Sequence, residues 1–149
     1  MILALKALRM NNLIIITKYF FLIMLLPIIS ISQESSIAYI NAGNEFLQQK
    51  KYAESIEMFD KAIELSPLEP RYYIYRGVAK YYMQEYKEAI IDFTRTIEIQ
   101  PDYAEAYNLR GIAKGDLGDK DGACSDWHKA YDLGYMSVIK LIQEFCIDE

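Results

Sequence analysis

The sequence predicts an all-α fold made of repeated helix pairs, and three observations support this prediction. Glycines recur every 34 residues, at Gly43, Gly77 and Gly111. Large apolar residues recur at the spacing of one buried helix face, as at Ile90, Phe93 and Ile97. No alternating pattern of a β-strand competes with this helical spacing. A fixed period of this length indicates a repeat architecture before any single helix is assigned.

Residues 1–32 precede the repeats and have the layout of a secretory signal peptide. This segment has no acidic residue, and its basic residues come before the densest apolar run, at residues 19–30. Small residues, Ser30 and Ser32, follow that run, so we expect cleavage near Ser32. Met10 is an alternative start, because the same order of basic and apolar segments survives from there.

The alternative for this leader is an uncleaved membrane anchor over residues 13–31. Thr17 and Lys18 interrupt the apolar stretch, and the part that follows is short for a hydrocarbon core that needs about 20 apolar residues. A cleaved leader is therefore favoured, and it predicts a periplasmic or extracellular protein.

The remaining residues, 33–149, are expected to form one acidic domain. They keep all 21 acidic residues of the chain but only thirteen of its 16 basic residues. Phosphate binding requires a positively charged face, so this balance disfavours a nucleic-acid partner.

Each glycine lies inside a longer recurring motif. An aromatic residue precedes each glycine by four positions, at Tyr39, Tyr73 and Tyr107. A second aromatic residue follows each glycine by sixteen positions, at Phe59, Phe93 and Trp127. Pro67 and Pro101 then end the second helix of the first two repeats, because proline lacks the amide donor that a helix needs. We expect Gly134, in a left-handed conformation, to end the corresponding helix of the third repeat.

This motif resembles the tetratricopeptide repeat. The resemblance implies a right-handed superhelical solenoid of antiparallel helix pairs, with repeats at residues 36–69, 70–103 and 104–137. The amphipathic segment at residues 136–146 is expected to form a helix that caps the last repeat, as solenoids require.

The resemblance also implies a concave groove that binds a protein or peptide and is lined by the first helix of each repeat. The expected groove residues are Ile40, Asn44, Leu47, Arg71, Ile74, Val78, Tyr81, Tyr82, Asn108 and Ile112. One known use of this family is to clamp a C-terminal carboxylate with Lys, Asn and Arg side chains. Asn44 fits that clamp, but its other positions hold Ile40, Tyr75, Glu105 and Leu109, which disfavours an adaptor for chaperone tails.

Repeats two and three share charged residues that repeat one lacks. Arg76 and Arg110 correspond to Ala42, Lys80 and Lys114 to Phe46, and Asp92 and Asp126 to Met58. Because the charges are present or absent together, we predict structural ion pairs Arg76–Asp92 and Arg110–Asp126, each with the lysine nearby. The alternative is that the arginines bind an acidic ligand.

Two cysteines in an exported chain are a candidate disulfide. Cys124 lies ten residues before Gly134 and Cys146 twelve after it, so they reach similar heights on adjacent antiparallel helices. We therefore predict a Cys124–Cys146 bond that holds the cap. The alternative is a small packed Cys124 and an unpaired terminal thiol.

No motif points to catalysis, a metal or a cofactor. His128 is the only histidine, and no nucleophile motif or second ligand cluster accompanies it. We therefore expect a binding scaffold rather than an enzyme. The alternatives are self-assembly through the N-terminal repeat face, where Ile37, Ile40 and Leu47 have no preceding repeat to cover them, and a membrane-tethered adaptor.

Overall fold

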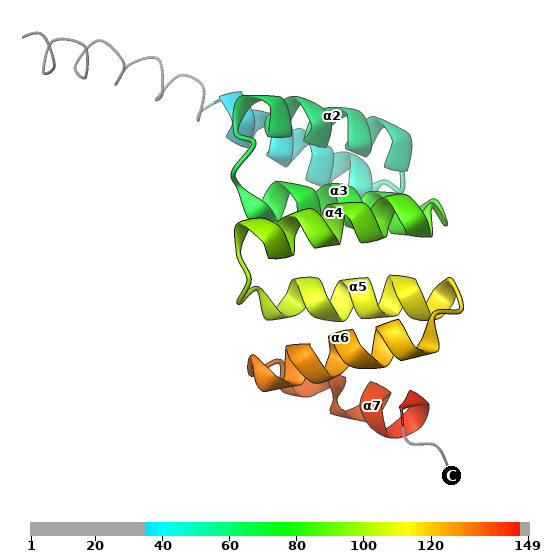
Figure 1. Ribbon diagram of the computed structural model, residues 1–149. Helices are drawn as coiled ribbons and strands as arrows, with labels where there is room; N and C mark the ends of the chain where they lie inside the picture. Colours follow the sequence, from blue (N-terminus) through cyan, green and yellow to red (C-terminus); the bar gives the residue numbers. More distant parts are fainter. Residues whose placement is uncertain (1–34, 147–149) are drawn as a thin grey trace, which may run out of the picture.

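The computed structural model describes residues 35–146, and this part of the chain contains helices and no strands (Figure 1). A helix over residues 35–48 pairs with α2 (Tyr52–Leu65). The next pairs are α3 (Pro70–Tyr82) with α4 (Tyr86–Ile99), and α5 (Ala104–Asp116) with α6 (Lys120–Asp132). Consecutive helices pack against each other and stack along the chain, which confirms the predicted all-α repeat fold.

The turns within the helix pairs repeat with the same 34-residue period. Lys50, Gln84 and Gly118 all have positive φ angles, of 60°, 65° and 91°. The amide that follows each of them donates to a carbonyl five residues earlier, a bond that closes the end of an α-helix. Gly134 has a φ of 92° after α6, as the sequence predicts.

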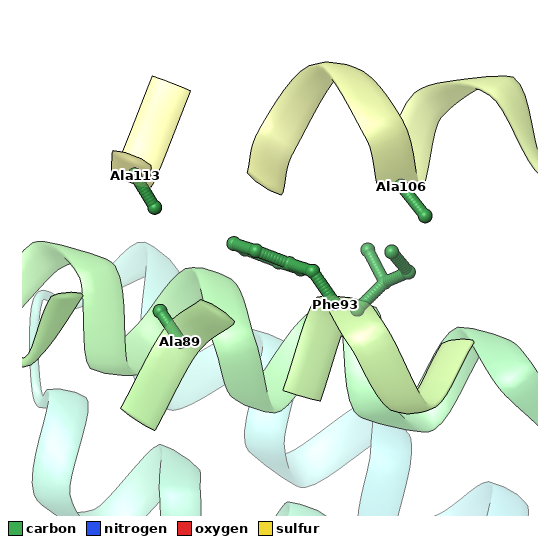
Figure 2. Packing of buried hydrophobic residues seen from close by; sticks show 5 residues of the cluster. Ala89, Phe93, Ala106 and Ala113 are labelled. Atoms are coloured by element: carbon green, nitrogen blue, oxygen red, sulfur yellow. The ribbon is translucent and has the colours of Figure 1, made fainter. Parts of the chain in front are cut away.

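The core lies between successive helices, and an aromatic ring from each second helix forms its centre. Phe93 of α4 is only 1% exposed and packs with Ala89 of its own helix and Ala106 and Ala113 of α5 (Figure 2). A Cβ atom at Gly77 of α3 would lie 2.6 Å from Cε1 of Phe93. The recurring glycines therefore leave room for the ring of the second helix.

We expect Gly77→Val to destabilise the protein by about 1–3 kcal/mol, because the added side chain would displace the buried Phe93 ring. Urea unfolding followed by circular dichroism measures the change. Gly115→Ala in α5 is the matched control, since its Cβ would have ordinary contacts of 3.7 Å or more. That control should be neutral or gain up to about 1 kcal/mol from helix propensity. Equal stability of the two variants would contradict the proposed role of Gly77.

The C-terminal segment covers α6 in two pieces. Met136–Val138 forms a short 3₁₀-helix, η1, and α7 (Ile139–Phe145) follows it. The sequence predicted one continuous helix here, whereas the structure starts the segment with a tighter turn that buries Val138 completely. Across residues 35–146, no helix is both long and apolar enough to cross a membrane.

Candidate functional site

The expected groove residues lie on the first helices of the three pairs, and they divide into two groups. Seven of them are exposed or half-buried: Asn44, Leu47, Arg71, Val78, Tyr81, Tyr82 and Ile112. We call the surface formed by these seven residues the first-helix face. It runs from the helix at 35–48 through α3 to α5.

The other three groove residues require a correction. Ile40, Ile74 and Asn108 occupy equivalent positions in the three repeats and are 8%, 5% and 8% exposed. Ile40 packs in the cluster that contains Phe59, and Ile74 packs in the cluster that contains Phe93. The side chains of Ile40 and Ile74 therefore point into the core, and all three residues offer almost no surface to a partner.

Tyrosines dominate the middle of the first-helix face. The Tyr81 hydroxyl donates a 2.5 Å hydrogen bond to Oδ2 of Asp116, which ties α3 to α5. That bond, with a smaller effect of burial, raises the pKa of Tyr81 to about 12. Tyr82 is 56% exposed, and its ring stacks on Tyr52 of α2 at a centroid distance of 5.4 Å. Tyr82 is therefore an ordered aromatic surface that a partner could contact.

The structure brings both expected ion pairs together. Asp92, only 1% exposed, receives Arg76 Nε at 2.9 Å, Arg76 Nη2 at 2.5 Å and Lys80 Nζ at 2.8 Å. Asp126 receives Arg110 at 2.9 and 2.7 Å and Lys114 at 2.8 Å. Each aspartate thus has two cationic partners at a helix interface.

The sequence did not reveal the second partner of each arginine, which lies in the preceding repeat. Nη1 of Arg76 donates to Oδ1 of Asp60 at 2.6 Å, and Nη1 of Arg110 donates to Oγ1 of Thr94 at 3.1 Å. Burial alone would lower the pKa of Arg76, but its bonds to Asp92 and Asp60 outweigh burial and raise it. Each guanidinium therefore contacts both its own helix pair and the preceding repeat.

A disulfide connects the cap to the third repeat. Cys124 of α6 and Cys146, just after α7, are bonded, with their Cα atoms 5.5 Å apart. The ring of Phe145 lies 5.9 Å from that of Trp127, and together with the disulfide it fixes α7 against α6.

A pocket of about 410 Å³ lies at the C-terminal end of the first-helix face. It is lined by residues of α5, α6, α7 and the turn between α5 and α6. The residues are Ile112, Gly115, Asp116, Gly118, Lys120, Ala123, Trp127, Leu141 and Phe145. The sequence placed Ile112 on the groove but did not predict a pocket, because α7 supplies two of its walls.

The described residues show little that resembles a reactive centre. Within residues 35–146, no group of three or more His, Cys, Asp and Glu side chains could hold a metal ion. Nδ1 of His128 lies 2.8 Å from the carbonyl oxygen of Cys124, within its own helix.

Comparison with known proteins agrees with this geometry. Residues 36–67 match the model of the tetratricopeptide repeat family. No protein in the curated set matches the chain.

Solved structures resemble the chain over most of its described length. The second tetratricopeptide domain of Spaghetti (RPAP3), bound to the HSP90 peptide SRMEEVD, is 28% identical with a TM-score of 0.65, over 68% of this chain and 94% of that one. The Arabidopsis OM64 domain is 25% identical with a TM-score of 0.68, over 70% and 87%. The N-terminal domain of stress-induced protein-1 from C. elegans is 20% identical with a TM-score of 0.72, over 78% and 98%, and shows the fold alone. The chain therefore carries a tetratricopeptide repeat match at residues 36–67 and has the fold of tetratricopeptide repeat domains.

Proposed function

We propose that this protein is an exported scaffold that binds a peptide segment of a protein partner on its first-helix face. The observation that carries the proposal is the ordered aromatic surface in the middle of that face, with Tyr82 exposed and stacked on Tyr52. Exposed, rigid tyrosines combine a large contact area with a polar group and are enriched at protein interfaces. A similar domain, from Spaghetti, is bound to a peptide, which supports the same use of the fold.

The partner differs in chemistry from the HSP90 peptide of that neighbour. The positions where a carboxylate clamp would need polar or basic groups hold Ile40, Tyr75, Glu105 and Leu109. Ile40 is also buried, so a shift of the peptide along the face would not bring this side chain into contact with a terminal carboxylate. The peptide SRMEEVD therefore serves as a negative control for binding.

Two features support export. The leader has the order of a signal peptide, although residues 1–34 lie outside the described part of the structure. Disulfides such as Cys124–Cys146 persist in oxidising compartments and are rare in the cytosol. Mass spectrometry of the mature chain from its native host measures whether cleavage occurs near Ser32, and an intact leader would favour the membrane-tethered alternative.

Cross-linking and co-purification from the native host test the binding face. We expect Tyr82→Ala to lose most of the captured partner, because the replacement removes an exposed aromatic contact of the kind that dominates interfaces. Ile91→Ala is the matched control, since Ile91 is also a large exposed apolar residue, at 66%, but lies on the second helix α4. Equal loss in both variants, or in neither, would contradict the proposed face.

Self-assembly is the second candidate, and one observation favours it. Ile37 on the first helix is 49% exposed, with no preceding repeat among the described residues to cover it. Sedimentation of the purified protein distinguishes the candidates: a mass that rises with concentration and is lowered by Ile37→Ser favours self-assembly, and a constant monomer mass favours the scaffold.

A further inference from the structure

Comparison of the repeats explains why the pocket beside α7 exists. Gly115 and Lys120, which line the pocket, correspond to Tyr81 and Tyr86 one period earlier and to Leu47 and Tyr52 two periods earlier. Repeats one and two thus fill this position with large side chains of their own. The third repeat has a glycine and a lysine there in place of two large side chains, and a pocket lies at this position.

The second repeat shows what occupies the equivalent space. The Tyr81 ring packs against the core cluster formed by α3, α4 and α5 and lies 5.5 Å from the ring of Tyr86. Its hydroxyl bonds to Asp116, which is also a pocket residue of the next repeat. An aromatic ring with a polar tip is therefore the side chain that this position accommodates in the same fold.

The pocket itself has walls suited to a ring. Trp127 and Ala123, both almost fully buried, come from α6, while Leu141 and Phe145 come from α7. Its volume of about 410 Å³ is within the range of ligand sites. Asp116 and Lys120 add one group of each charge to the lining.

We propose that this pocket binds an aromatic side chain of the partner, which takes the place that Tyr81 fills in the second repeat. This inference rests on the proposed scaffold function and names the anchor residue that the scaffold recognises. The pocket adjoins Ile112, so an extended peptide on the first-helix face reaches it without leaving that surface.

The first test uses two small probes, N-acetyl-L-tyrosinamide and N-acetyl-L-leucinamide. Trp127 is the only tryptophan of the chain and lines the pocket, so its fluorescence and its indole N–H signal report occupancy directly. We expect tyrosinamide to bind in the millimolar range and about threefold to tenfold more tightly than leucinamide, since paired rings add to area burial. No saturable change at Trp127, or equal binding of both amides, would overturn the proposal.

Variants then locate the site. Gly115→Leu should abolish tyrosinamide binding while preserving the fold, because a Cβ there has only ordinary contacts, 3.7 Å from Trp127, and the added side chain occupies the pocket. Circular dichroism checks that the variant is folded. If folded Gly115→Leu still binds tyrosinamide as the unaltered protein does, the pocket is not the site.

Tyr82→Ala separates this inference from the scaffold proposal. Tyr82 does not line the pocket, so this variant should bind tyrosinamide normally while losing the partner. Partner capture that depends on Tyr82 but is unaffected by Gly115→Leu would leave the scaffold standing and refute the aromatic anchor. Capture that is insensitive to Tyr82, together with normal tyrosinamide binding, would refute the scaffold proposal and leave the aromatic site in the pocket standing.

Discussion

Asp92→Ala is expected to destabilise the protein by about 3–5 kcal/mol, because it removes one side of a buried ion pair. Asp92 is 1% exposed and accepts bonds from Arg76 and Lys80, which are themselves mostly buried. Without the carboxylate, Lys80 loses the aspartate that it binds and Arg76 keeps only its bond to Asp60, at a helix interface with little access to water. The midpoint of urea unfolding measures the loss.

Two controls make this expectation specific. Glu57→Ala removes an exposed partner of Lys61 and should cost no more than about 1 kcal/mol, since surface ion pairs contribute little. The triple variant Arg76→Ala, Lys80→Phe and Asp92→Met introduces the side chains found at these positions in repeat one. It should be more stable than Asp92→Ala, because no buried charge is left unpaired. A triple variant less stable than the single one would contradict this account.

Cys146→Ser is the second replacement with a large expected effect. The disulfide closes a loop across 22 residues, and its loss should cost about 3 kcal/mol in the chain-entropy model. Because α7 has no fully buried residue, the loss should appear first as fraying of this helix. Amide hydrogen exchange of Leu141 and Ile142 measures that fraying, and chemical denaturation measures the total.

Reduction provides the control for this variant. Reducing agent should lower the stability of the unaltered protein to that of Cys146→Ser and leave the variant itself unchanged. Two alkylatable thiols in the non-reduced exported protein would show that the bond does not form in the native compartment.

The sequence predicted much of this architecture because its repeats can be compared with one another. The 34-residue period of the glycines predicted the helix pairs. The joint presence of Arg76, Lys80 and Asp92 predicted that these three side chains lie together. The same comparison did not show that position 40 and its equivalents are buried, since that depends on how closely adjacent repeats pack. The role of Asp60 was missed for a related reason, because its arginine partner belongs to the next repeat.

The pocket illustrates a further limit of sequence reasoning. The presence of Gly115 where Tyr81 stands one repeat earlier is visible in the sequence. It does not by itself predict a cavity, because a neighbouring side chain can fill such a gap. The position of α7 decides the outcome. Leu141 and Phe145 of this helix form one wall of the space and leave it unfilled.

The arginine bridges between repeats have a consequence for how the protein unfolds. Arg76 joins Asp60 of α2 to Asp92 of α4, so one guanidinium spans two helix pairs. In solenoids, the coupling between neighbours decides whether repeats melt singly or as a block. The Arg76 bridge adds to that coupling between the first two pairs. The first repeat, which lacks an arginine and a buried aspartate of its own, is thus tied into the cooperative unit by its neighbour.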